Sequence, residues 1–452
     1  MELQNIKRVY LIGIGGIGMS GLARYFAHLG CIVCGYDKTS TDLTDQLHHE
    51  GIQVIFEDRV DWIPFAFKEP NENTLIIYTP AIPRDSAILN YFKDNGFELF
   101  KRSHVLGLIS RSMFTIAVAG THGKTTTSCM IAHILKDSGK DCSAFLGGIS
   151  SNYNSNVLFG KNNIVVVEAD EFDRSFLTLR PDIAVITSMD ADHLDIYGNH
   201  EHLTESFRQF ASQLKENGRL IYHEDLPLTA EGITYSAHGP ADVRAVNIRV
   251  KDGSFYFDFK NHLEDIKDIK LGIAGLHNIE NATAAIEVAL KLDIEPALIK
   301  RALESFRGVK RRFEYIVKTK EHIYIDDYAH HPEELRAAIS SIKTLYPDKK
   351  LTTIFQPHLY TRTRDFADGF AEVLDMSDEL VMLDIYPARE LPIEGVTSDM
   401  ILSRMQMLNK RKCGKQEAVD LMRTEKPELL LTVGAGDIDQ LVQPLKNVLE
   451  NV

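Results

Sequence analysis

The sequence contains no apolar run long enough to cross a bilayer. A membrane-spanning helix needs about 20 mostly apolar residues, and the apolar runs in these 452 residues are much shorter. Residues 1–8 (MELQNIKR) also lack the apolar core of a signal peptide. We therefore expect a cytoplasmic protein without membrane insertion.

Cysteine is scarce, and basic charge is outweighed by acidic charge. The five cysteines are an odd number and are scattered at positions 31, 34, 129, 142 and 413, which is not typical of a disulfide framework. Cys31 and Cys34 have redox-motif spacing but lie in an apolar strand pattern, which favours two core thiols. The net charge of -14 argues against nucleic acid as a partner, because broad binding to it uses many Lys and Arg side chains.

The strongest motif is an apolar run at 115–119 that breaks into Gly120-Thr121-His122-Gly123-Lys124-Thr125-Thr126. A strand that ends in glycines before a helix presents backbone N–H groups and a helix N-terminus to phosphate. Lys124 is then expected on the β- and γ-phosphates of ATP, and Thr125 on Mg²⁺. Position 118 is valine rather than the glycine of the full Walker pattern. The motif predicts a shortened P-loop, and an ordinary glycine-rich turn is the alternative.

Two apolar runs downstream of this motif end in acidic residues. Residues 164–171 (IVVVEADE) and 183–195 (IAVITSMDADHLD) are typical of buried parallel strands, which deliver their ends to the same edge as a P-loop. Each acid alone is more often a solvated strand end, but two such ends in a P-loop domain favour metal and phosphate chemistry. Glu168 is the candidate Mg²⁺ ligand, and the residues near it in sequence are Asp170, Glu171, Asp192, His193 and Asp195.

The N-terminal region carries a second phosphate-binding pattern. A strand at 9–12 runs into Gly13-Ile-Gly15-Gly16-Ile-Gly18, and a helix over 19–29 and a strand over 31–36 follow, ending at Asp37. This is the dinucleotide fingerprint in its proper context, with an acid placed to hold a ribose hydroxyl. Alone it favours a nicotinamide-dependent oxidoreductase, although it indicates a diphosphate at a helix N-terminus and not a hydride.

The rest of the chain extends the α/β pattern to three predicted domains. Short alternating runs over 218–271 predict hairpin-like β structure, as an insertion or a sheet edge. From 322 onward, four apolar strands separated by helices predict a parallel doubly wound sheet. His330 and His331 lack the partners of a zinc site. We expect a Rossmann-like domain at 1–106, a central P-loop ATPase-like domain with a parallel sheet and a β insertion at 107–309, and a C-terminal Rossmann-like domain at 310–452.

Together these motifs resemble those of the Mur ligase family. The resemblance rests on residues 13–21 (GIGGIGMSG), 120–126 (GTHGKTT), 168–171 (EADE), 326–332 (DDYAHHP) and 355–365 (FQPHLYTRTRD), so it covers all three predicted domains. It implies a ligase of peptidoglycan precursor synthesis that uses ATP and Mg²⁺ to turn the lactyl carboxylate of UDP-N-acetylmuramate into an acyl phosphate. The amine of L-alanine then attacks that intermediate.

The resemblance also implies roles for single residues. The sugar nucleotide is expected at Gly13, Gly15, Gly16, Gly18, Asp37 and His104, and the metal at Thr125, Glu168 and His193. ATP is expected at residues 120–126, His277, Asn278 and Arg312. Tyr328, His330 and Arg362 are expected at the alanine and acyl-phosphate end, where His330 orients or deprotonates the amine. Lys124, His193, His330 and Arg362 are the expected catalytic residues.

Some positions depart from the family pattern, and three alternative functions remain. Phe172 replaces a small polar residue, and Leu276 and Leu359 each replace an arginine. Leu359 removes a cation near the amino-acid site, so selectivity for alanine over glycine or serine stays open. Arg208 stands near the position of a carbamoylated lysine in sibling ligases, so no carbamate is expected.

The first alternative is a ligase that attaches a recycled tripeptide to the same nucleotide sugar, and residues 357–362 (PHLYTR) argue against it. A nicotinamide dehydrogenase would leave the P-loop without a task. A non-catalytic, nucleotide-switched binding protein would not need Lys124, Glu168 and His193 together.

Overall fold

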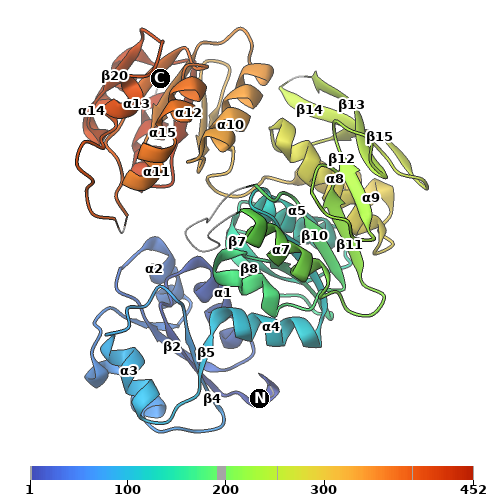
Figure 1. The fold of residues 1–452 in the computed structure, drawn as a ribbon, viewed down its shortest axis with the longest axis vertical. Helices are drawn as coiled ribbons and strands as arrows, with labels where there is room; N and C mark the ends of the chain where they lie inside the picture. Colours follow the sequence, from blue (N-terminus) through green and yellow to red (C-terminus); the bar gives the residue numbers. More distant parts are fainter. Residues whose placement is uncertain (1–2, 191–199, 252, 389, 451–452) are drawn as a thin grey trace. The chain divides into compact units, whose positions relative to one another are not determined.

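The computed structural model describes residues 3–190, 200–251, 253–388 and 390–450. Contacts divide the chain into two compact units. The first comprises 1–246, 259–267 and 280–305, and the second comprises 247–258, 268–279 and 306–452. The described residues form three β-sheets with helices packed against them (Figure 1).

The first sheet has five parallel strands in the order β3-β2-β1-β4-β5. Parallel strands covered on both faces are apolar throughout, and Val9 to Ile12 of the central strand are fully buried. The predicted strand, glycine turn, helix and strand at the N-terminus are confirmed. The elements are β1 (Arg8–Ile12), α1 (Ile17–His28), β2 (Ile32–Tyr36), α2 (Asp42–His49), β3 (Gln53–Ile55), β4 (Thr74–Tyr78), α3 (Ala87–Asp94) and β5 (Leu99–Lys101), with 3-10 turns η1 (Leu3–Asn5), η2 (Val60–Trp62) and η3 (Phe65–Phe67).

The second sheet has ten strands in the order β15-β14-β13-β12-β11-β10-β6-β9-β7-β8. Its strands are β6 (Phe114–Ala119), β7 (Ser143–Ser150), β8 (Ser155–Leu158), β9 (Ile164–Glu168), β10 (Ile183–Ile186), β11 (Arg219–His223), β12 (Ile233–Ser236), β13 (Val243–Lys251), β14 (Ser254–Lys260) and β15 (Asp265–Lys270). Its helices are α4 (Arg102–Ser112), α5 (Lys124–Asp137), η4 (Phe172–Thr178), α7 (His200–Ala211), α8 (Leu276–Leu290) and α9 (Pro296–Ser305). The predicted P-loop strand and helix are thus confirmed.

The hairpin-like structure expected over 218–271 is only partly correct. β13, β14 and β15 do form the edge of the sheet. In contrast, β11 and β12 continue the parallel sheet, because β11 pairs in parallel with β10 and β12 with β11. These two strands have five and four residues, too few to show a pattern that distinguishes them from hairpin strands.

The third sheet has the order β16-β17-β21-β18-β19-β20, and all its pairs are parallel except β16 with β17. Four of its strands are those predicted, and β16 and β20 flank them. The strands are β16 (Glu314–Lys318), β17 (Ile323–Asp327), β18 (Leu351–Phe355), β19 (Glu379–Met382), β20 (Lys410–Lys412) and β21 (Leu429–Val433). The helices are α10 (Pro332–Leu345), α11 (Tyr360–Asp365), α12 (Ala367–Leu374), α13 (Asp399–Leu402), α14 (Lys415–Glu425), η5 (Asp437–Leu441) and α15 (Val442–Glu450).

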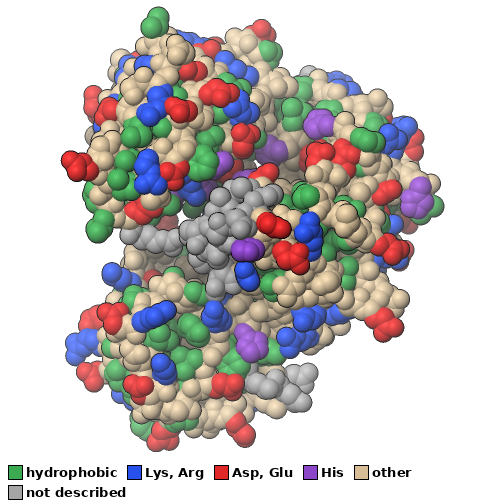
Figure 2. Space-filling model, in the orientation of Figure 1, with side chains coloured by type: hydrophobic (Ala, Val, Ile, Leu, Met, Phe, Trp, Pro, Cys, Tyr) green, Lys and Arg blue, Asp and Glu red, His purple; other side chains and the backbone are tan. Residues whose placement is uncertain are grey.

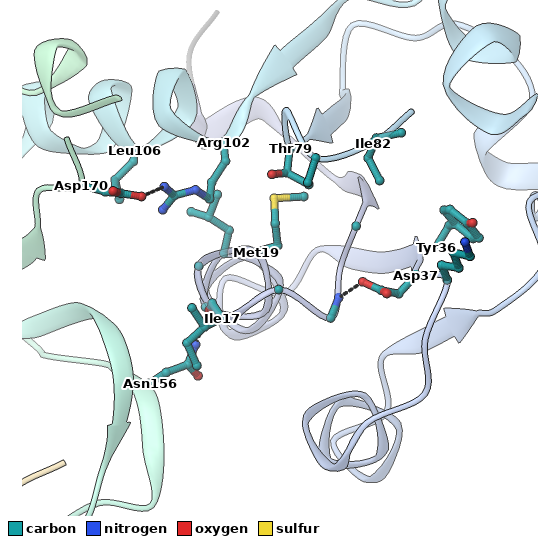
Figure 3. Close-up of a pocket in the computed structure, with 18 of the residues that line it drawn as sticks. Ile17, Met19, Tyr36, Asp37, Thr79, Ile82, Arg102, Leu106, Asn156 and Asp170 are labelled. Carbon is teal, nitrogen blue, oxygen red and sulfur yellow. Dashed lines mark hydrogen bonds and ion pairs between the residues drawn. The ribbon is translucent and has the colours of Figure 1, made fainter. Parts of the chain in front are cut away.

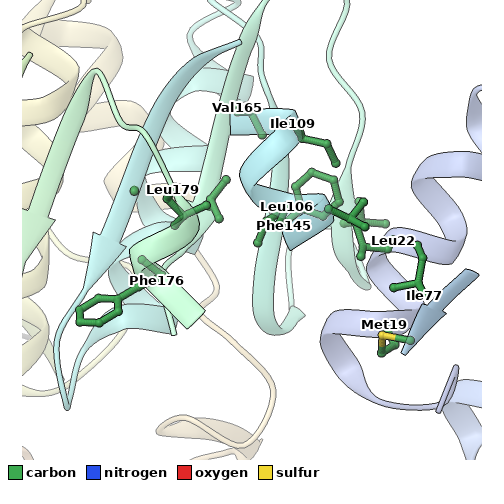
Figure 4. Packing of buried hydrophobic residues seen from close by; sticks show 14 of the residues in the cluster. Met19, Leu22, Ile77, Leu106, Ile109, Phe145, Val165, Phe176 and Leu179 are labelled. Atoms are coloured by element: carbon green, nitrogen blue, oxygen red, sulfur yellow. The ribbon is translucent and has the colours of Figure 1, made fainter. Parts of the chain in front are cut away.

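One buried apolar cluster joins the first sheet to the second within the first unit. Met19 and Leu22 of α1 pack in the same cluster as Leu106 of α4, Phe145 of β7 and Val165 of β9 (Figure 4). Packed interiors resist deformation. The glycine loop before α1 and the glycine loop before α5 are therefore held at a fixed distance from each other. A ligand that reaches both loops would meet them in this arrangement.

On the face shown in Figure 2, acidic and basic side chains are interspersed, and the described residues form no broad basic patch there. Among the described helices, none combines the length and the apolar character that a membrane span requires.

Candidate active site

The P-loop is shaped by two glycines in left-handed or extended positive-φ conformations. Gly120 has φ of 136° and Gly123 has φ of 80°, values that favour glycine. A Cβ at Gly120 would overlap Thr187 Oγ1, and one at Gly123 would lie 2.7 Å from Asn281 Oδ1. The loop between β6 and α5 is therefore compact, and its backbone can approach a phosphate closely.

Lys124, the first residue of α5, is folded back over this loop. Its Nζ donates to the carbonyl oxygens of Gly120 (2.5 Å) and Thr121 (3.3 Å) and pairs with Glu171 Oε1 at 2.9 Å. Burial lowers the pKa of Lys124, but the carboxylates of Glu171 and Glu168 outweigh it, and the pKa is raised. Lys124 is therefore charged at neutral pH and supplies a cation at the helix N-terminus.

Glu168, the last residue of β9, faces the same loop. Its Oε1 accepts from Thr125 Oγ1 (3.0 Å) and its Oε2 accepts from the amide of Gly147 (2.8 Å). Burial raises the pKa of Glu168, and Lys124 opposes this rise. A hydroxyl and a buried carboxylate are hard oxygen donors that suit Mg²⁺, which keeps several water ligands, and a cation would offset the cost of burying this charge.

The third expected metal ligand, His193, lies outside the described residues, as do Asp192 and Asp195. Among the described residues, no three His, Cys, Asp or Glu side chains form a metal-binding group. Thr125 and Glu168 are therefore the part of the predicted metal site that the structure brings together.

A cavity of about 1150 Å³ extends from the first glycine loop to Glu168 (Figure 3). Gly13, Gly15, Gly16 and Gly18 line it where α1 begins, and Gly147, Glu168 and Asp170 line it beside the P-loop. The N-cap of α1 is a glycine with no side-chain cap, so the first N–H groups of the helix are open to an anion. The predicted sugar-nucleotide and metal sites thus share one cavity.

Asp37 has a role that the fingerprint did not predict. Its Oδ2 accepts from the amide of Gly15 at 2.8 Å, and its Oδ1 accepts from the amide of Thr39 at 3.1 Å. A Cβ at Gly15 would lie 2.8 Å from the same Oδ2. The Asp37 carboxylate therefore holds the glycine loop closed. A ribose hydroxyl that bound Asp37 would share this carboxylate with the amides of Gly15 and Thr39.

His104 is not among the residues that line the cavity. It is exposed, and its ring packs against Phe100 with centroids 5.4 Å apart. The expected contact of His104 with the substrate stays a prediction. The cavity is instead lined by Arg102, whose Nη2 lies 3.2 Å from Asp170 Oδ2. Sequence reasoning missed this residue because a single arginine at a helix start belongs to no recognisable pattern.

In the second unit, the predicted amino-acid residues lie together. The Nδ1 of His330 lies 2.9 Å from the carbonyl oxygen of Tyr328. A carbonyl only accepts, so Nδ1 carries the proton and Nε2 of the neutral ring is an acceptor. Burial lowers the pKa of His330, which favours this neutral form. Arg362 Nη1 lies 3.2 Å from His358 Nδ1, and the rings of His358 and His330 meet edge to face at 5.9 Å.

The two arginines of the predicted joint differ in their contacts. Arg311 Nε donates to the buried Asp326 at 3.0 Å, and its Nη2 donates to the carbonyl oxygen of Gly434 at 2.7 Å. Arg312 is more exposed, and its Nη1 lies 4.0 Å from Oε1 of Glu334. Arg311 is therefore held by the fold, whereas Arg312 has a guanidinium that can reach a ligand.

The start of α8 contains the two predicted adenine contacts. Gly275 has φ of 113°, and Asn278 Nδ2 donates to the carbonyl oxygen of Ala274 at 2.5 Å. Asn278 is buried and stabilises this turn, while His277 is exposed. The turn thus presents His277 at the helix start, where a base could stack on it.

Comparison with known proteins places all three regions in one family. Three family models match: the catalytic domain of the Mur ligase family at 8–113, the Mur ligase middle domain at 118–289 and the Mur ligase glutamate ligase domain at 311–436. The chain is 47% identical to the UDP-N-acetylmuramate–L-alanine ligase of Flavobacterium johnsoniae, with 100% of both chains covered. It is 49% identical to that of Parabacteroides distasonis, with 99% of this chain and 98% of the relative covered.

Two solved structures of ligases are similar to this chain along nearly its whole length. The UDP-N-acetylmuramate-alanine ligase of Thermotoga maritima matches with a TM-score of 0.84 and 28% identity over 98% of this chain and 99% of that one. A murein peptide ligase from Psychrobacter arcticus matches with a TM-score of 0.67 and 22% identity over 99% of both chains. At that identity the second match shows a shared fold alone.

Proposed function

The chain belongs to the Mur ligase family, and we propose that it joins L-alanine to UDP-N-acetylmuramate at the expense of ATP, in peptidoglycan precursor synthesis. Full-length relatives that carry this activity in their names support the assignment. The observation that carries it in the structure is the single cavity that runs from the first glycine loop to Glu168 beside the P-loop. Such a cavity suits a substrate with a diphosphate at one end and a carboxylate at the other.

The chemistry requires the carboxylate to be activated, because a free carboxylate does not react with amines. ATP transfers its γ-phosphoryl group to a lactyl carboxylate oxygen, which gives an acyl phosphate and ADP. Lys124 and the N-terminus of α5 hold the phosphates during this transfer. Thr125 and Glu168, with His193, would hold Mg²⁺. When bound, Mg²⁺ neutralises the charge that otherwise keeps phosphate and carboxylate apart.

The amine then attacks the acyl carbon, the amide bond forms and inorganic phosphate leaves. We assign this end of the reaction to Tyr328, His330 and Arg362. The neutral His330 has an acceptor nitrogen for an ammonium proton, and Arg362 carries the charge that an amino-acid carboxylate needs. With leucine at position 359, Arg362 is the cation of this motif that we assign to the carboxylate of alanine.

The remaining assignments follow the same proposal. The diphosphate lies at Gly13, Gly15, Gly16 and Gly18, with Asp37 closing the loop. Adenine lies at His277 and Asn278, and Arg312 reaches a nucleotide phosphate. The proposal includes three domains, at residues 1–106, 107–309 and 310–452, and a cytoplasmic location. His104 is proposed to lie close to the sugar nucleotide.

The reaction is tested by phosphate release with UDP-N-acetylmuramate, Mg²⁺·ATP and one amine at a time. L-alanine should give the highest kcat/KM, above glycine and L-serine. Turnover with the tripeptide alone would support the recycling ligase and overturn the proposal. Binding of NADH without ADP release would favour the dehydrogenase.

The acyl phosphate is tested separately by replacing alanine with hydroxylamine. Hydroxylamine attacks acyl phosphates to give a hydroxamate, so a UDP-N-acetylmuramate hydroxamate should accumulate together with ADP and phosphate. A Lys124→Met variant is the matched control, because it keeps the length of the side chain and removes its charge. Equal hydroxamate formation by that variant would contradict the role of Lys124.

A further inference from the structure

Arg102, the first residue of α4, brings a guanidinium to the N-terminus of α1. A Cβ at Gly18 would lie 2.6 Å from Nη1 and 3.1 Å from Cδ of Arg102. The arginine therefore fills the space left by the missing side chain, which explains the glycine at this position. In Figure 3 its side chain lies beside the start of α1 and points toward Asp170. A cation and a helix N-terminus both favour an anion at this point of the cavity.

The partner of this guanidinium is Asp170, which also lines the cavity. Arg102 Nη2 lies 3.2 Å from Asp170 Oδ2, and the two side chains are 22% and 40% exposed. Asp170 stands between Glu168 and Glu171 in sequence, and both of these contact P-loop side chains. One ion pair thus connects the glycine loop of the first sheet to the acidic strand end beside the P-loop.

We propose that Arg102 exchanges Asp170 for the diphosphate of the sugar nucleotide, so that binding of one substrate releases a carboxylate at the site of the other. A partly exposed ion pair contributes little stability. A guanidinium gains more from a diphosphate, which offers several charged acceptor oxygens to its N–H groups. The released Asp170 adds negative charge beside Glu168, where a metal-bound nucleotide is expected. The exchange rests on the proposed function for the identity of the diphosphate.

The first test is calorimetric titration of the full-length protein with UDP in metal-free buffer. Asp170→Asn should tighten UDP binding by about two- to fivefold, because the amide competes less well for Arg102. Arg102→Met should weaken UDP binding by about tenfold, and Asp170→Asn should then add nothing. Arg102→Lys keeps the charge but loses the paired N–H donors of the guanidinium. Its affinity for UDP should lie between those of the wild type and Arg102→Met. Uridine, which has no phosphate, should bind wild type and Asp170→Asn equally.

Asp85→Asn is the matched control, since Asp85 is an exposed carboxylate that lines the same cavity. It removes the same charge without releasing Arg102. Equal tightening by Asp85→Asn and Asp170→Asn would indicate general electrostatics and overturn the exchange. Unchanged or weaker UDP binding by Asp170→Asn would also overturn it, and both results leave the proposed function standing. Failure of the wild-type protein to bind UDP would overturn both.

Release of Asp170 gives a second readout through the reciprocity of coupled binding. Saturating UDP should tighten the binding of a Mg²⁺-loaded, non-hydrolysable ATP analogue to the wild type by about twofold or more. Asp170→Asn should lose this coupling, and Asp85→Asn should keep it. Independent binding of the two ligands to the wild type would overturn the release step.

Discussion

The amide of Gly147 donates a hydrogen bond of 2.8 Å to Oε2 of Glu168, and a side chain at position 147 would overlap Oε1 of the same carboxylate. Glu168 is thereby fixed from two sides, since Thr125 donates to Oε1 at 3.0 Å. The glycine at position 147 of β7 is thus required by the position of the Glu168 carboxylate on β9, where we propose the metal. The glycine is needed because of its neighbour Glu168, and not because of the conformation of β7.

Gly147→Ala should therefore impair metal binding while leaving the P-loop sequence intact. The added methyl group displaces the Glu168 carboxylate, and loss of such a supporting contact typically costs about 10- to 100-fold in metal affinity. The Mg²⁺ concentration for half-maximal phosphate release should rise accordingly. Gly414→Ala is the control, because a Cβ there meets nothing within 4 Å. An unchanged Mg²⁺ requirement in Gly147→Ala would contradict the placement of the metal at Glu168.

Lys124 should contribute to stability as well as to catalysis. Its Nζ lies 2.9 Å from Glu171, whose side chain is 1% exposed. Lys124→Met removes this cation from a buried carboxylate, and we expect the free energy of unfolding to fall by about 3 kcal/mol. Glu171→Gln in the Lys124→Met background should recover most of that loss without restoring phosphate release. Denaturant unfolding of the single and double variants, beside the activity assay, separates the two roles. A double variant no more stable than Lys124→Met would refute the stabilising role.

The parts of the fold that could be predicted are those in which burial forces a pattern. Strands such as β1 and β9 are covered on both faces, so their continuous apolar residues stand out in the sequence. β20 (Lys410–Lys412) could not be predicted, because it is three basic residues long. It is a strand only because β19 provides backbone partners. Tertiary pairing, and not local preference, decides such segments.

The same contrast applies to the candidate site. The glycine loops and the acidic end of β9 could be predicted, because ligands such as phosphate and Mg²⁺ constrain residue types at fixed spacing. Arg102 and Gly147 could not, since each acts on a residue distant in sequence, at Asp170 and Glu168 respectively. Asp37 is the opposite case. The fingerprint identified this residue as a ribose contact, but in the structure its carboxylate accepts a hydrogen bond from the amide of Gly15 in the glycine loop.

His330 should set the acid limit of the alanine reaction. Burial lowers its pKa, and a base acts only in its unprotonated form. Activity that depends on His330 is therefore retained as pH falls to the usual histidine value of about 6.5 and lost only below it. The ratio of kcat/KM for L-alanine between wild type and His330→Gln should be constant above that pH and decline below it. His49→Gln, on the exposed end of α2, should reproduce the wild-type profile. A decline that begins above pH 6.5 would show that His330 is not buried in its working form.

Arg311 and Arg312 offer a matched pair that separates a structural cation from a ligand-binding one. Arg311 contacts Asp326, whose side chain is 0% exposed, at 3.0 Å. Arg311→Met should therefore lower the free energy of unfolding by about 3 kcal/mol, since a buried carboxylate loses its cation. Arg312→Met should change stability by less than about 0.5 kcal/mol, because its side chain is 38% exposed and lies 4.0 Å from Glu334.

The two variants should separate in the opposite sense when ATP binding is measured. Arg312→Met should weaken a non-hydrolysable ATP analogue by about tenfold, because a guanidinium–phosphate contact is charge-assisted. Arg311→Met should bind it nearly as well as the wild type at temperatures where it is folded, since its guanidinium already contacts Asp326 and Gly434. Calorimetry on both variants, with unfolding curves from the same preparations, gives the comparison. If Arg311→Met lost affinity and Arg312→Met did not, the phosphate contact would belong to Arg311, and the Asp326 pair would have to open when ATP binds.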